Sequence, residues 1–269
     1  MDNVYIKKVR SCGVFLILIY SLFLSGCMIN NPNNGGRDKT LDNKELTLQD
    51  IAYNRTKNPD YRIGIEENGR IVPYLVLTDE YNGECLLLRE FLLDEPMKYN
   101  VAKEYSGYYE NSEIDKYLNE EFINRFSLEL RNNIVDSTIV ITARASLDGG
   151  GKNTTFINRK VFLLSFTEMN RNIGSRTNLK EGEPLEYFAK DSNRIAYYEN
   201  GRAGSWWLRT PNAGYADVVC GVGTKGEIGI SGIHGTEGEY LNGIRPAFCL
   251  RRETKIVKAD DELFVLSKD

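Results

Sequence analysis

The sequence predicts an α+β domain with small antiparallel sheets, two or more short helices and much irregular loop. Three observations lead to this fold class. Two Asn-Gly turns follow each other at 68–69 and 82–83, residues 112–126 carry helical apolar spacing, and glycines recur throughout 204–243. We place these features in one globular domain, residues 51–269.

The first elements of the domain form a predicted antiparallel meander. Residues 62–65, 71–77 and 84–89 are short apolar segments separated by the two Asn-Gly turns, and this dipeptide between apolar segments is a strong hairpin signal. Pro73 falls in the second segment. Because proline has no backbone N–H, we expect this residue at a sheet edge or at a bulge.

The next region is predicted to be helical. Ser112 is followed three residues later by Asp115, and the side chains expected on one face are Ile114, Tyr117, Leu118, Phe122 and Phe126. We expect this helix to pack against the sheet. A second short helix should begin after Ser127 and end near residue 133, and the β-branched segment 137–143 should be a strand.

The remainder of the chain is expected to alternate strands and turns. A strand at 161–164 precedes a capping box, Ser165 to Glu168, that starts a short helix. Short strands should occupy the glycine-rich region, and 256–266 should form a closing hairpin. Residues 148–153 read as a mobile loop. This loop lacks the first glycine and the Ser or Thr of a phosphate-binding loop.

The N-terminus has the layout of a bacterial lipoprotein signal. Lys7, Lys8 and Arg10 precede a short apolar run, which ends in Leu24-Ser25-Gly26-Cys27. We expect residues 1–26 to be removed, Cys27 to be acylated, and residues 27–50 to form a flexible tether. The protein would then be anchored to the cell membrane on its extracytoplasmic face. The alternatives are an uncleaved anchor and an ordinary signal peptide.

The net charge argues against one class of partner, and the sequence context of the cysteines indicates their state. The chain has 269 residues and a formal net charge of −4, with no cluster of Lys and Arg, which argues against nucleic acid as a partner. Cys85 lies in an apolar run and should be a buried thiol. Cys220 and Cys249 could either remain free or form a disulfide across strands.

No catalytic residue, metal ligand or cofactor site is predicted. His234 is the only histidine, and we interpret it as a loop residue. No Cys or His pair has the spacing of metal ligands. A pair of carboxylates for glycoside hydrolysis leaves no local trace in a sequence, so an extracytoplasmic hydrolase stays as the alternative function.

Trp206, Trp207, Arg209 and Arg245 are the candidate ligand-binding or structural residues. On a strand, Trp206 and Trp207 point to opposite faces, so one indole should lie in the core and the other should be exposed beside a guanidinium. We expect Arg209 and Arg245 to connect loops through bonds to carbonyls or carboxylates. If they bind a ligand instead, a sugar ring or a carboxylate is the suitable class.

Four ordered segments resemble one known family: Tyr109 to Asn119, Val161 to Ser165, Ser205-Trp206-Trp207-Leu208-Arg209-Thr210-Pro211, and Gly243-Ile244-Arg245-Pro246-Ala247-Phe248. The family is domain of unknown function 6273, found mainly in Gram-positive bacteria as secreted or surface-attached modules. The resemblance covers about residues 62–250. The family usually has Ser where this chain has Thr210, a change that keeps the hydroxyl.

The C-terminal plan is also similar to the formylglycine-generating-enzyme branch of the C-type-lectin-like fold. This similarity implies a sulfatase-modifying-factor-like domain, but Cys220 and Cys249 fall in no motif of those enzymes, so their activity is not carried over. The expected function is a non-catalytic binding module. Its loops 148–153 and 224–243 would present a surface to a glycan, a peptide or a surface protein.

Overall fold

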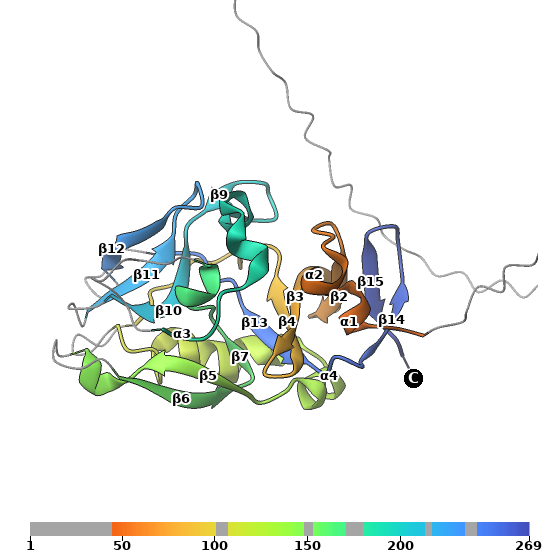
Figure 1. Ribbon diagram of the computed structural model, residues 1–269, viewed down its shortest axis with the longest axis horizontal. Coiled ribbons are helices and arrows are strands. Elements are labelled where there is room, and N and C mark those ends of the chain that lie inside the picture. Colours follow the sequence, from red (N-terminus) through yellow and green to blue (C-terminus); the bar gives the residue numbers. More distant parts are fainter. Residues whose placement is uncertain are drawn as a thin grey trace, which may run out of the picture. The chain divides into compact units, whose positions relative to one another are not determined.

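The computed structural model describes residues 45–100, 107–147, 153–170, 180–212, 217–234 and 241–268, without the side chains of 229–234. Its largest element is an eight-stranded sheet in the order β1-β14-β15-β2-β3-β4-β13-β7 (Figure 1). Neighbouring strands are antiparallel except for the parallel pair β15 and β2. The strands are β1 (Leu46–Thr47), β14 (Lys255–Lys258), β15 (Leu263–Leu266), β2 (Arg62–Glu67), β3 (Arg70–Tyr81), β4 (Glu84–Arg89), β13 (Ala247–Leu250) and β7 (Val161–Phe162).

The predicted meander is confirmed by β2, β3 and β4. Both Asn-Gly turns have positive φ at each position, with Asn68 at 49°, Gly69 at 79°, Asn82 at 55° and Gly83 at 85°. Two consecutive positive φ values define the type I′ turn, whose twist matches that of the strands it joins. The closing hairpin is confirmed as well, by the antiparallel pair β14 and β15.

The expectation for Pro73 is wrong, because β3 is an interior strand paired on both sides. Pro73 lies opposite Gly64 of β2, and its carbonyl accepts a hydrogen bond from Glu90 N–H at 3.0 Å, beyond the last ladder pair between Tyr74 and Arg89. Its nitrogen therefore faces the place where β4 has ended. An interior strand tolerates proline there, because the one bond that residue 73 cannot donate lies at the very end of the pairing with β4.

The predicted helical region is confirmed as three joined turns of different type. These are α3 (Glu113–Lys116), the π-helical η1 (Tyr117–Glu121) and the 3₁₀-helical η2 (Phe122–Arg125). The Ser112 side chain accepts a bond from Asp115 N–H, as its sequence pattern indicates. Ile114, Leu118, Phe122 and Phe126 are all buried. Ser127 likewise caps α4 (Leu128–Asn133).

Three smaller sheets complete the strands. The glycine-rich region forms β10 (Trp206–Pro211), β11 (Val218–Val222) and β12 (Ile228–His234) in that order, which confirms the short strands expected there. β5 (Ser137–Thr142) pairs with β6 (Thr154–Arg159), and β8 (Ala196–Tyr197) pairs with β9 (Ala203–Gly204). Figure 1 shows the β5–β6 hairpin beneath the helical turns that contain α3.

The other helical elements are short and few of them could be located from the sequence. Helix α1 (Leu48–Ile51) begins before the expected domain start at residue 51, and its Leu48 is fully buried. Helix α2 (Tyr53–Thr56) follows it. The 3₁₀ turns are η3 (Arg144–Ser146), η4 (Thr167–Met169), η5 (Glu186–Ala189) and η6 (Asp191–Arg194). No helix among the described residues is long and apolar enough to cross a membrane. The fold class is thus α+β.

Candidate functional site

A fully buried ion pair links the aromatic strand to the turn after β7. Arg209 of β10 donates from Nη1 to Oε2 of Glu168 and from Nη2 to Oε1, each at 2.8 Å. Neither side chain has any exposed surface. This is the two-point geometry in which a guanidinium matches a carboxylate. The same site raises the pKa of Arg209, because the nearby Glu168 outweighs the cost of burial.

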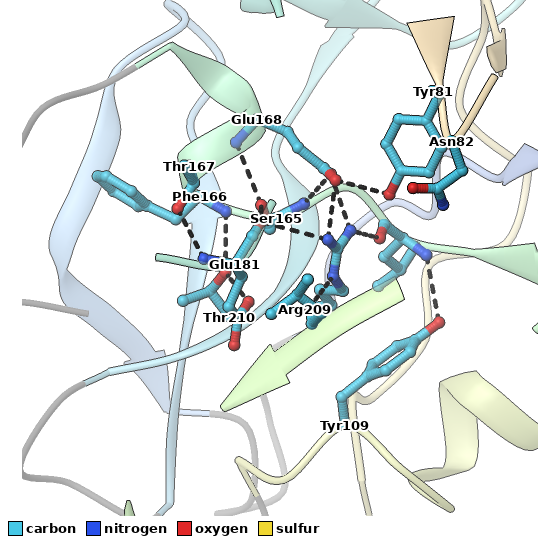
Figure 2. A network of polar contacts seen from close by, with 12 residues as sticks. Tyr81, Asn82, Tyr109, Ser165, Phe166, Thr167, Glu168, Glu181, Arg209 and Thr210 are labelled. Atoms are coloured by element: carbon cyan, nitrogen blue, oxygen red, sulfur yellow. Dashed lines mark hydrogen bonds and ion pairs between the residues drawn. The ribbon is translucent and has the colours of Figure 1, made fainter. Parts of the chain in front are cut away.

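Glu168 is also the last residue of the capping box that the sequence predicts. Ser165 N–H donates to Glu168 Oε2 at 2.7 Å, and Glu168 N–H donates to Ser165 Oγ at 3.1 Å. The Tyr81 hydroxyl adds a third donor to Glu168, at 2.7 Å from Oε1. Figure 2 shows these groups converging on the carboxylate. One acid thus caps the start of a local turn and binds a strand that is distant in the sequence.

A second buried carboxylate, Glu181, stands on the other side of the arginine. Its Oε1 accepts bonds from the backbone and the hydroxyl of Thr142, and its Oε2 accepts the Thr210 hydroxyl at 2.6 Å. Thr210 Oγ1 in turn accepts Phe166 N–H. Burial raises the pKa of Glu181, with Arg209 opposing that effect. The hydroxyl at position 210 therefore has a structural task, which either Ser or Thr can perform.

Arg209 further ties three backbone segments together. Its Nη1 donates to the carbonyl of Leu163 at 2.7 Å, its Nε to that of Val140 at 3.1 Å, and its Nη2 to that of Glu181 at 3.4 Å. These residues lie after β7, in β5 and before η5. The structure thus places Arg209 where a loop-connecting arginine was expected, in a cluster without room for a ligand beside its five N–H donors.

Trp206 and Trp207 are both fully buried, so the expectation of one exposed indole is wrong. The Trp206 ring donates from Nε1 to the Arg194 carbonyl at 3.1 Å, and Trp207 donates to the Met97 carbonyl at 2.8 Å. The two rings do point to opposite faces of the strand. Both faces of β10 are covered by other segments, and this coverage cannot be recognised from strand alternation.

Arg245 is buried beside one of these indoles. Its guanidinium carbon lies 5.4 Å from the ring centroid of Trp206, and its Nε donates to the Arg89 carbonyl at 2.9 Å. Among the described residues, its Nη1 has no hydrogen-bond partner. Burial lowers the pKa of Arg245 to about 10. It joins the end of β4 to the segment before β13, through the kind of bond to a carbonyl that the sequence predicts.

The described cysteines, Cys85, Cys220 and Cys249, are all buried, and none of them is in a disulfide. The disulfide between Cys220 and Cys249 is therefore absent. Cys249 lies on β13 and Cys220 on β11, in separate sheets, whereas the register of β13 and β4 places Leu250 opposite Cys85. Burial raises the pKa of Cys85 and raises that of Cys249 to about 12. These are thiols of a core rather than reactive groups.

Several predicted features lie outside the described residues. They are the signal peptide, the lipidation site Cys27, most of the loop 148–153, and the side chain of His234 with residues 235–240. Within the described part of the chain, no group of three His, Cys, Asp or Glu side chains could hold a metal ion.

An open polar hollow of about 490 Å³ lies at the surface over α3, η1 and the end of β6. Sequence reasoning missed it, because its members come from three separated segments, 111–120, residue 136 and 158–160. Three anionic and three cationic side chains face it together with three amides. The lining residues are Asn111, Asp115, Lys116, Asn119, Glu120, Asp136, Asn158, Arg159 and Lys160.

An ion pair joins two of the lining residues, the partly buried Arg159 and the buried Asp115. Arg159 donates from Nε and Nη2 to the two oxygens of Asp115, at 2.7 and 2.8 Å, and this contact raises the pKa of Arg159. Asn119 bonds to Asp115 and also bridges to both backbone groups of Val161. The rim, in contrast, contains exposed side chains such as Lys116 and Glu120. A set of paired lining residues with exposed polar side chains around it is suited to hold a small polar ligand.

The fold and these two sites define a class: an α+β domain on a mixed sheet, whose aromatic strand is locked by buried arginines. The chain belongs to the family described as Domain of unknown function (DUF6273), whose model matches residues 82–252. This confirms the resemblance found in the sequence. No curated protein and no solved structure was found to match the chain.

Proposed function

We propose that the protein is a non-catalytic binding module that holds a polar ligand, a glycan in the first instance, in the hollow above α3 and β6. The observation that carries the proposal is the hollow itself. The bonds among Asp115, Arg159 and Asn119 hold these three lining residues in position without a ligand. Preorganised polar groups reduce the ordering cost of binding.

The charge balance of the hollow selects the ligand class. Its anionic and cationic side chains are equal in number, and its amides offer both donors and acceptors. A hydroxyl-rich, uncharged ligand satisfies such a lining better than a polyanion or an apolar molecule does. Peptides and surface proteins remain the other ligand classes that the module would meet at a cell surface.

The cellular setting is part of the same proposal. Cys27 after Leu24-Ser25-Gly26 supports a lipid anchor on the extracytoplasmic face of a Gram-positive cell membrane. We also propose that the domain is related to the C-type-lectin-like fold. The strand from Trp206 to Arg209 and the Gly-x-Arg at 243–245 support this relation. A module so anchored would face cell-wall glycans.

The test is an array of glycans and peptidoglycan fragments probed with residues 28–269. Lys116→Ala and Glu120→Ala remove exposed groups from the rim, and each should weaken binding at least about tenfold, the effect of about 1.4 kcal/mol. Lys225→Ala and Glu129→Ala are matched controls, since both are exposed outside the hollow. Unchanged binding in Lys116→Ala and Glu120→Ala would show that the hollow is not the binding site.

A carboxylate-based hydrolase is the second candidate, and one observation favours it. Glu120 and Asp136 both line the hollow, and glycoside hydrolysis needs two carboxylic groups on either side of a bond. Incubation with cell-wall polymers separates the two functions. Retention without new reducing ends supports the binding module, whereas steady product formation that is lost in Glu120→Gln or Asp136→Asn would establish the hydrolase.

A further inference from the structure

Strand β6 is a sheet edge whose outer backbone groups have no partner strand among the described residues. β6 pairs only with β5, and the sheet has no third strand. Ala143 N–H donates to Asn153 O at 2.9 Å, which sets the alternation along the hairpin. Residues 153, 155, 157 and 159 thus bond inward to β5, and residues 154, 156 and 158 direct their N–H and C=O groups outward.

The matching residues of β5 support this assignment, because all of them bond to the body of the domain. The carbonyls of Thr138 and Val140 accept bonds from Asn82 and Arg209, and Thr142 N–H donates to Glu181. The β5 edge is thus covered. On β6, the carbonyl of Asn158 accepts a bond from the side chain of the adjacent Arg159. The other outward groups of β6 bond to no backbone group of the described residues.

The side chains along this edge are exposed and uncharged. Phe156 is 67% exposed, and its neighbours on the same face, Thr154 and Asn158, are exposed too. Natural edge strands are usually protected by a charge, a proline or a bulge. Residues 154–158 have none of these. In Figure 1, β6 runs along the outer margin of the fold with no other ribbon beyond it.

We infer that β6 pairs antiparallel with β6 of a second copy of this chain, about a twofold axis at Phe156. Centring the pairing there places Phe156 opposite Phe156 and Thr154 opposite Asn158, so all three outward-facing residues bond to outward-facing residues. Centres at Thr155 or Ile157 match fewer of them. Because a twofold axis uses the same edge of both copies, the contact leaves no further β6 edge unpaired and the assembly is a dimer.

The side chains complement each other in this register. The Asn158 Oδ1 already accepts the Thr138 hydroxyl at 2.9 Å, which leaves the Asn158 amide N–H groups to donate to the hydroxyl of Thr154 across the axis. The two Phe156 rings would cover one another, and facing aromatic pairs stabilise sheets. Next to the edge, the charge of Arg159 is compensated by Asp115, so like charges do not meet there.

The pairing would join two hairpins into one four-stranded sheet. Asn158, Arg159 and Lys160 also line the polar hollow, so each partner strand would end beside the hollow of the other copy. Two hollows on one rigid sheet would engage a repeating polymer together, which increases avidity without new contacts. The pairing itself does not depend on what the hollow binds.

Cysteine crosslinking of the full chain in membranes tests the pairing. Phe156→Cys places two thiols opposite each other at about 5.5 Å between Cα atoms, a separation that a disulfide can span. With copper phenanthroline as oxidant, this variant should form at least five times more dimer than Leu128→Cys. Leu128 is 65% exposed and lies on α4, which makes it a control of matched exposure. Equal dimer yields would overturn the inference.

Charged substitutions at residue 156 test whether the partner of β6 is a second copy of this chain. Because residue 156 faces itself, Phe156→Lys and Phe156→Glu should each abolish co-purification of two differently tagged copies, and mixing the two variants should restore it. Both side chains would be exposed, and an unchanged melting temperature verifies the fold. Binding of another strand-forming protein at this edge would show no such mutual rescue. Failure of the mixed pair to reassociate, or intact association of either variant alone, would contradict pairing with a second copy.

Discussion

Arg209 and Glu168 hold each other in a two-point ion pair with no exposed surface on either side chain, with both N–O distances at 2.8 Å. Glu168 simultaneously completes the capping box of Ser165. The aromatic strand and the turn after β7 are thus joined by one carboxylate. Paired burial of this kind is sensitive to loss of either member, because the remaining charge is stranded in a medium of low polarity.

Both tryptophans should be protected from solvent quenchers. The chain has two tryptophans, Trp206 and Trp207, and both are fully buried. We expect iodide to quench the fluorescence of the folded domain several times less than that of the urea-unfolded chain. Trp207→Phe should remove part of the emission without changing the accessibility of the rest. A strongly quenched component that disappears in Trp207→Phe would show that this indole is exposed.

Stability should decrease with pH through Glu181. Burial raises the pKa of this carboxyl above its ordinary value of 4.5, so the folded state holds the proton more tightly than the unfolded state does. The stability contributed by the protonated form is complete below pH 4.5 and is lost as pH rises through the raised value. Urea unfolding of the parent and Glu181→Gln between pH 4 and 8 measures this. The parent should lose stability relative to the variant as pH rises, and a difference that stays constant would refute it.

The thiols should be unreactive until the domain unfolds. Burial raises the pKa of Cys249 to about 12 and raises that of Cys85, which leaves almost no thiolate at pH 8. In residues 28–269, we expect no rapid labelling by a thiol reagent in the native state and three labelled thiols in urea. A single labelled thiol in urea without reductant would reveal a disulfide and contradict the arrangement of β11 and β13.

Anchoring should depend on Cys27. If this residue carries the lipid, Cys27→Ser should release the protein from the membrane fraction, since two or three acyl chains supply the anchor. Carbonate-washed membranes probed by immunoblot give the answer. Cys12→Ser, in the apolar run of the signal, is the control and should remain membrane-bound. Continued sedimentation of the Cys27→Ser protein with membranes would exclude the lipid anchor.

Local patterns predicted local structure well. The Asn-Gly pairs, the Ser112 and Ser127 caps and the capping box at Ser165 all depend on residues within four positions of each other, and each appears in the structure. The hydrogen bonds and backbone angles of a cap or a tight turn involve only neighbouring residues, so a few consecutive residues are enough to predict it.

Burial across segments could not be predicted in the same way. Strand alternation predicts which face a tryptophan of β10 points to, but segments distant in the sequence cover both faces and bury Trp207. In the same way, the absent N–H of Pro73 does not reveal that β3 has a neighbour on each side. Glu181 had no local signature, since its partners Thr142 and Thr210 lie 39 and 29 positions away. The polar hollow was missed for the same reason. A charged residue without a local partner is the one signal that could have pointed to Glu181.

Arg209 holds the aromatic strand β10 in place through Glu168, and a double-mutant cycle measures this coupling. Arg209→Met and Glu168→Gln should each lower the free energy of unfolding by about 3–5 kcal/mol, because each leaves a buried charge or its polar partners unpaired. The double variant should lose at least about 1 kcal/mol less than the sum of the two, as residues in direct contact do. Effects that add within about 0.5 kcal/mol would show that the two residues act independently and would contradict this account.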